Sequence, residues 1–138
     1  MKKKYLLTVQ QLHDAVQNTI RVYNDYRLDR KLGPNSSYTI YGPGYFLRFQ
    51  YFNVEGGCEI KTVSGKAIGK ISEEAARAHV AEFYRRVDQV VNKEVALTPD
   101  ILNKDVYKSG STAIGLIQLV KLIVAIIAIV LAVMALAH

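Results

Sequence analysis

One segment near the C-terminus constrains this chain more than any other. Residues 113–137 read AIGLIQLVKLIVAIIAIVLAVMALA, and only Gln118 and Lys121 among them are polar. A helix of that length would measure about 37 Å, whereas the hydrocarbon core of a bilayer is about 30 Å thick. A domain of about 100 residues has no core wide enough to surround a helix that is apolar on every side. The segment therefore predicts a single transmembrane helix.

Charge is distributed very unevenly around this segment. The chain has 18 basic and 12 acidic residues, and Lys121 is the only one of them that lies beyond residue 108. Because Lys104 and Lys108 precede the predicted span, the positive-inside rule keeps the N-terminal domain in the cytoplasm. Cys58 is the only cysteine, which agrees with a reducing compartment. We expect a single-pass, tail-anchored membrane protein.

The predicted helix carries a stripe of small and polar residues. The stripe follows a spacing of three and four residues: Gln118, Lys121, Ala125, Ala128, Ala132 and Ala135. Small residues let helices approach closely in lipid, and polar residues find partners between helices. We therefore expect this stripe to pack against other transmembrane helices, in a homo-oligomer or in a membrane complex. The alternative is that alanine only fills the helix and Lys121 extends to the headgroups.

The polar part of the chain contains two amphipathic helical segments. Thr8 and Gln11 have the spacing of a capping box, and apolar residues at helical spacing follow, which predicts a helix over residues 9–31. Ser72, followed by two glutamates, is a typical N-cap of a second helix. Thr98-Pro99 predicts a short third helix that ends near residue 107.

The pattern between the first two helices is that of antiparallel strands. Segments rich in Tyr, Phe, Ile and Val are separated by glycine turns, and they predict strands over residues 37–41, 45–54 and 58–63. A short fourth strand near residues 67–69 is an option. On the longest strand, alternate residues from Tyr45 are expected to face the helices, and the opposite face carries Phe46, Arg48, Gln50 and Phe52.

The predicted fold class is therefore α+β. We expect a small cytoplasmic α-β-β-β-α domain over residues 1–96, a juxtamembrane helix and linker over residues 97–111, and the transmembrane helix over residues 112–138.

The residues that carry chemistry do not form a catalytic pattern. His13, His79 and His138 lack the spacing of metal ligands. The segment Gly65–Lys70 resembles a phosphate loop, but it has three residues between its glycines instead of four, and no Ser or Thr follows its second lysine. The sequence predicts a protein that is not an enzyme, with no catalytic residues, no metal and no cofactor.

The order of helix, three strands and helix over residues Thr8–Ala81 resembles the double-stranded-RNA-binding domain. Gly42-Pro43 ahead of the long strand and Ser72 at the start of the second helix fit the resemblance. That family holds RNA phosphates with a lysine pair just after the serine. This sequence has Glu73-Glu74 there, which reverses the charge, so RNA is not the expected partner.

The net charge of +6 still favours an anionic partner, either lipid headgroups or a soluble ligand. The candidate anion-binding residues are the lysines of the N-terminus and of the glycine-bounded turn: Lys2, Lys3, Lys4, Lys66 and Lys70.

Two functions follow as hypotheses. The first is a non-enzymatic subunit of a membrane assembly, whose cytoplasmic domain docks protein partners and whose helix lies in the lipid bilayer. The alternative is a ligand-gated membrane effector, whose basic domain senses a nucleotide or nucleic acid and whose helices oligomerise to disrupt the membrane.

Overall fold

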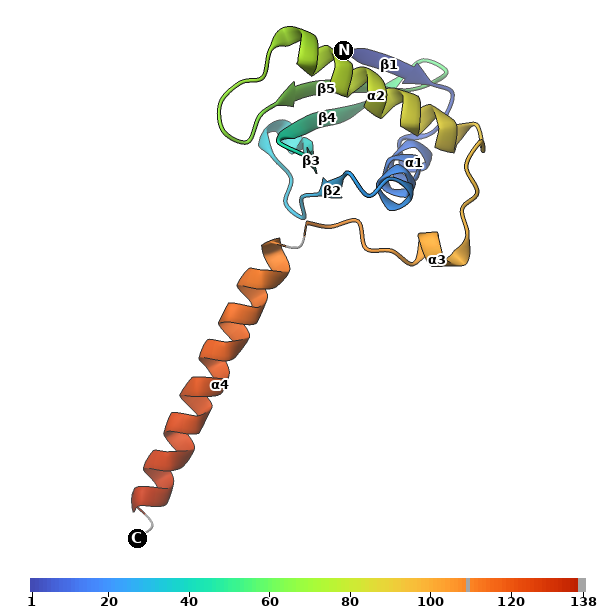
Figure 1. Ribbon diagram of the computed structural model, residues 1–138. Helices are drawn as coiled ribbons and strands as arrows, with labels where there is room; N and C mark the ends of the chain where they lie inside the picture. The colour runs from blue at the N-terminus through green and yellow to red at the C-terminus, as the bar shows by residue number, and fades with distance from the viewer. Residues whose placement is uncertain (109, 137–138) are drawn as a thin grey trace. The chain divides into compact units, whose positions relative to one another are not determined.

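The computed structural model describes the backbone of residues 1–108 and 110–136 and the side chains of residues 1–108 and 123–136. The chain divides into two compact units, Met1–Tyr107 and Lys108–His138. The division falls inside the segment predicted to link the polar domain to the apolar helix. The first unit holds the sheet and its helices, and the second contains the helix α4, Gly110–Leu136 (Figure 1).

The first unit is built on a five-stranded antiparallel sheet with the strand order β1-β5-β4-β3-β2. The strands are β1 (Lys2–Tyr5), β2 (Arg27–Leu28), β3 (Tyr38–Gly42), β4 (Tyr45–Val54) and β5 (Gly57–Gly65). Tight turns join β3, β4 and β5 into a meander. The two remaining strands come from chain segments on either side of the first helix, and they close the two edges of the meander.

Three helices and one 3₁₀ turn accompany the sheet. They are α1 (Val9–Val22), the 3₁₀ turn η1 (Pro34–Ser36), α2 (Glu73–Val91) and α3 (Pro99–Leu102). The predicted capping box of Thr8 and Gln11 is present, and Ser72 and Thr98 cap α2 and α3 with their hydroxyl groups. These caps satisfy amide groups that the first helical turn leaves unpaired, so each helix begins where the sequence predicts.

The core lies between the sheet and the helices α1 and α2, which pack on the same face (Figure 1). Phe49 of β4 and Phe83 of α2 are 1% and 0% exposed, and their ring centroids lie 6.0 Å apart. Tyr26 packs edge-on against the same Phe83 ring. Fully buried aliphatic residues complete this layer: Leu12, Val16, Ile20, Ile40, Leu47, Ile60 and Val87.

Several predicted element boundaries need correction. The strand over residues 45–54 is confirmed, but no strand forms at residues 67–69. The first helix ends at Val22 and not near residue 31, because Tyr23 adopts an extended backbone and the chain turns to bury Tyr26 and Leu28 in the core. The predicted three-strand sheet was also incomplete, since β1 and β2 were missed. The three consecutive lysines of β1 hide its strand character, although such charges are common on edge strands.

The predicted membrane span is also corrected. Among the residues described here, no helix combines the length and the apolar character that crossing a bilayer requires. On this finding, the predictions of a transmembrane helix and of a single-pass, tail-anchored membrane protein with a cytoplasmic N-terminal domain are wrong.

Candidate functional site

The sheet face opposite α1 and α2 is not covered by a helix of the first unit, and we call it the outer face. As the sequence predicts, alternate residues of β4 lie on it: Phe46, Arg48, Gln50 and Phe52. The strand register places Lys61 beside Gln50 and Val63 beside Arg48. It also places Lys2 beside Lys61. The outer face therefore mixes cationic and aromatic side chains, unlike the apolar face under the helices.

A pocket of about 250 Å³ opens on the outer face. The η1 turn forms one wall with Pro34, Asn35 and Ser37. The strands β4 and β5 form the rest of the lining, with polar side chains from Arg48, Gln50 and Lys61 and an apolar one from Val63. The pocket is thus assembled from three chain segments that only the fold brings together.

The η1 turn is held against the sheet by hydrogen bonds. Gln50 donates from Nε2 to the carbonyl oxygen of Asn35 at 2.6 Å. Within the turn, the Gly33 amide donates to the Ser37 carbonyl at 2.7 Å. Asn35 and Ser36 both adopt positive φ angles, 56° and 58°, which are unfavourable for residues other than glycine. Such backbone persists where its surroundings fix it, and it is common at ligand sites.

The hydroxyl of Ser37 is the most informative atom of the pocket. Ser37 is 5% exposed, and its Oγ is the one buried side-chain polar atom without a hydrogen-bond partner in the described part of the chain. Leaving such a group unsatisfied costs about 1–3 kcal/mol. Ser37 lines the pocket, and its Oγ lies beside Gly33, where an added Cβ would come within 2.8 Å of it. An acceptor that reached Oγ from the pocket would remove that cost.

The two cations of the pocket are available for a ligand. Within residues 1–108, neither Arg48 nor Lys61 forms an ion pair with a carboxylate, and both are exposed. The Arg48 guanidinium lies 5.0 Å from the centroid of the Phe46 ring, a cation–π contact that leaves its N–H donors usable. Burial raises the pKa of the nearby Tyr41, as does its hydrogen bond to Asp29. That phenol therefore stays neutral and adds no negative charge to the face.

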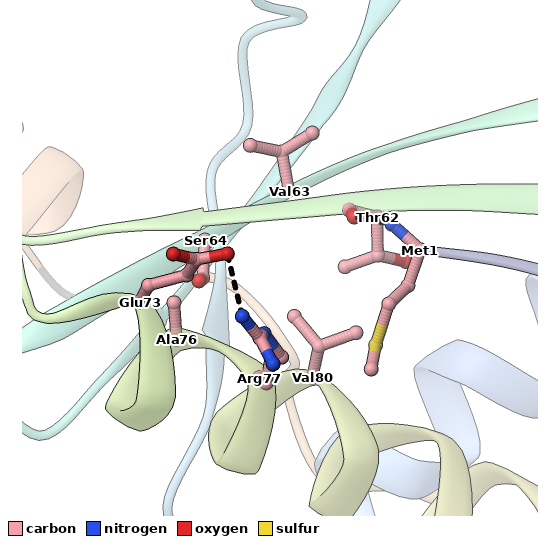
Figure 2. A pocket seen from close by; sticks show the side chains of 8 residues that line it. All are labelled: Met1, Thr62, Val63, Ser64, Glu73, Ala76, Arg77 and Val80. Atoms are coloured by element: carbon pink, nitrogen blue, oxygen red, sulfur yellow. Dashed lines mark hydrogen bonds and ion pairs between the residues drawn. The ribbon is translucent and has the colours of Figure 1, made fainter.

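A second pocket of about 340 Å³ lies between β5 and the start of α2 (Figure 2). Arg77 points into it, but its guanidinium is paired with Glu73 at 2.6 Å. The amino group of Met1 donates to the Thr62 carbonyl at 3.1 Å. Because both cationic groups already have partners and a carboxylate lies beside them, this pocket is the weaker candidate for an anion.

The predicted anion-binding lysines do not form one site. The Lys3 ammonium pairs with Asp88 of α2, so it acts in packing β1 against the helix. Lys2 and Lys4 are exposed on the outer face, and Lys66 and Lys70 are exposed in the loop between β5 and α2. Sequence reasoning missed the three residues that do converge, Ser37, Arg48 and Lys61. The signal available was for Arg48 alone, on the second face of β4, where Phe46 and Gln50 are its neighbours.

The predicted helix-packing stripe stays a prediction. Its alanines within the described side chains are exposed on α4: Ala125, Ala128, Ala132 and Ala135. The side chains of Gln118 and Lys121 lie outside the described residues.

Of the three histidines, His138 lies outside the described residues, and His13 and His79 occupy structural positions, as does the cysteine. His79 stacks on Tyr45 with ring centroids 3.7 Å apart, and His13 contacts the Tyr51 hydroxyl at 3.0 Å. Cys58 is buried in β5. Over the described ranges, no group of three or more His, Cys, Asp or Glu residues is arranged to hold a metal ion.

Comparison of this chain with protein-family models, with curated proteins and with solved structures finds no match. The function is therefore argued from the geometry of the outer face alone.

Proposed function

We propose that the Met1–Tyr107 unit is a non-enzymatic binding domain that holds an anionic group in the pocket between the η1 turn and the outer face. The observation that supports this most is the buried Ser37 hydroxyl, which has no partner and lies in a pocket that also contains Arg48 and Lys61. A buried unpaired donor is uncommon in folded proteins and calls for an explanation. A bound oxyanion supplies one.

Arg48, Lys61 and Ser37 each contribute a different interaction to the bound anion. Arg48 presents a planar fork of donors that matches two oxygens of a phosphate or carboxylate. Lys61 adds a compact charge from the neighbouring strand. Ser37 donates a neutral hydrogen bond from the buried end of the pocket and selects for an acceptor there. The binding is a recognition event, and no nucleophile or general base takes part in it.

Titration calorimetry of the full chain with pyrophosphate tests this proposal. We expect saturable binding, and we expect Arg48→Ala or Lys61→Ala to weaken it about tenfold or more, as for the loss of a charged hydrogen bond. Arg85→Ala is the matched control, because Arg85 carries the same charge but pairs with Glu82 on α2, away from the outer face. Absence of binding, or equal loss in all three variants, would overturn the proposal.

Docking of a protein partner, the main role predicted from the sequence, is a second candidate. The exposed apolar side chains of the outer face favour it, since Phe52 and Val63 are 42% and 58% exposed. A protein-docking face should lose its partner when Phe52 or Val63 is replaced and should keep it when Ser37 is replaced. The anion pocket predicts that Ser37→Ala weakens binding.

A further inference from the structure

We propose that the natural ligand of the outer face is a single-stranded nucleic acid, which lies along β4 with one phosphate in the Ser37 pocket. This inference rests on the proposed function, because it requires the pocket to accept an anion. It adds the class of ligand and extends the binding surface beyond the pocket.

The first support is an aromatic and cationic strip along β4. Phe46 and Phe52 lie on the outer face at its two ends, six residues and about 20 Å apart at 3.3 Å per residue. Arg48 and Gln50 lie between them. Single-stranded nucleic acids bind to surfaces of this kind, because bases stack on aromatic rings or guanidinium planes while cations follow the phosphates.

The two aromatic rings are not equivalent. A Cβ placed on Gly65 would come within 2.7 Å of the Phe46 ring, so this ring lies against the sheet over a residue without a side chain. Its contact with Arg48 engages it further. Phe52 is 42% exposed and has no ring partner among the described aromatic contacts. Phe52 is therefore the open stacking platform, and Arg48 over Phe46 offers a second planar surface.

The second support is the charge beside the strip. Lys61 is the register partner of Gln50, and Lys2 is the partner of Lys61, so cations extend sideways from the pocket across two strands. Lys4 lies further along β1, beside Glu59, a carboxylate that is also the register partner of Phe52. With Arg48, the strip carries four cations, and the carboxylates beside it are Glu59 and Asp29, which accepts a hydrogen bond from Tyr41. This excess of positive charge suits a chain of phosphates better than a single small anion.

The aromatic platform and the cationic, phosphate-binding side chains are separate on this face, and this arrangement favours a single strand over a duplex. Stacking on Phe52 requires bases that are unpaired and free to turn out of a helix. A duplex would bring phosphates to Arg48, Lys61 and Lys2 but would leave Phe52 without a base.

Fluorescence anisotropy of the full chain with labelled 12-nucleotide oligo(dT) and oligo(U), and with a 12-base-pair duplex, tests this inference. We expect the single strands to bind more tightly than the duplex, with affinity that falls as salt rises. Phe52→Ala should weaken single-strand binding about tenfold, whereas pyrophosphate binding should not change. Leu6→Ala is the matched control, because Leu6 is 83% exposed and lies outside the strip.

The outcomes separate this inference from the proposed function. Pyrophosphate binding without oligonucleotide binding would overturn the nucleic-acid inference and leave the anion pocket in place. Oligonucleotide binding that Phe52→Ala does not weaken, or that the duplex matches, would also overturn it. If neither probe binds, both proposals fail.

Discussion

The two faces of β4 differ in exposure: one is buried under the helices, and the other is exposed. On the face under the helices, Leu47 and Phe49 are 0% and 1% exposed, and they pack against α1 and α2. On the outer face, Arg48 and Phe52 are exposed, and Arg48 lies in the sequence between the buried Leu47 and Phe49. Because side chains alternate along a strand, stability and recognition can be assigned to alternate residues. Substitutions on the outer face should therefore alter binding with little effect on folding.

The largest expected effect is on the covered face. Phe49→Ala should lower the free energy of unfolding by about 3–5 kcal/mol, because it removes a fully buried ring and leaves a cavity against Phe83. Phe52→Ala, three positions further along the same strand, should change it by less than about 0.5 kcal/mol. Denaturant unfolding of both variants measures the difference. Similar losses in the two would mean that the outer face is also part of the core.

A smaller loss is expected where β1 joins the sheet. Gly57→Ala would place a Cβ 2.1 Å from the backbone oxygen of Tyr5, so β1 must move to accommodate it. We expect a loss of about 1–3 kcal/mol, as for other overpacked sites.

Hydrogen exchange of the Gly57→Ala variant tests whether β1 is displaced. The Thr62 amide donates to the carbonyl of Met1, so its protection should fall more than that of amides between β3 and β4. Unchanged protection at Thr62 would show that β1 is not displaced.

The next prediction concerns a substitution that should stabilise the protein. Ser37→Ala removes a buried hydroxyl that has no partner, so the free energy of unfolding should rise by about 1 kcal/mol or stay unchanged. Thr62→Val is the contrasting variant, because its hydroxyl accepts a hydrogen bond from Tyr84 at 2.8 Å, and it should destabilise by about 1 kcal/mol. Thermal unfolding of both variants without ligand tests this. A clear loss in Ser37→Ala would show that the hydroxyl contributes to folding.

The smallest expected effect is a pH dependence on the covered side. Burial lowers the pKa of His13 from its ordinary value of 6.5, an effect that the nearby Asp14 partly offsets. The folded state therefore favours neutral His13, so its contribution to stability is fully present above pH 6.5 and is lost as the pH falls from 6.5 through the lower pKa of the folded state. His13→Gln should reduce the slope of stability between pH 7.5 and 5.5. An unchanged slope would exclude His13 as its source.

The sequence predicted the parts of the fold that depend on local signals. The capping residues Thr8, Ser72 and Thr98 mark helix starts, and the glycine turns mark the ends of β4. Local signals failed for β1 and β2, which are short and become strands only because β5 and β3 offer them free edges. The sequence pattern also predicted that the first helix continues through Tyr26. The helix instead ends at Val22, and a turn of the chain buries Tyr26.

The candidate site was only half visible in the sequence. The alternation on β4 identified Arg48 and Phe52 as residues of one face. The pocket itself depends on the η1 turn, where Asn35 and Ser36 take left-handed conformations that sequence pattern does not indicate. The partnerless Ser37 hydroxyl follows from that turn, and no motif marks it. The lysine clusters in the sequence predicted a different anion-binding site. Lys3 of that set instead pairs with Asp88 and packs β1 against α2.

The most direct test of the anion pocket is a ¹H–¹⁵N correlation titration of the full chain with pyrophosphate. The proposal predicts that amide shifts concentrate in three segments that meet only in the fold, residues 33–37, 48–50 and 61–63. It also predicts that Ser37→Ala and Arg48→Ala suppress them together. Shifts centred instead on residues 66–74, at the lysine turn and the start of α2, would contradict the account, as would the absence of any saturable shift.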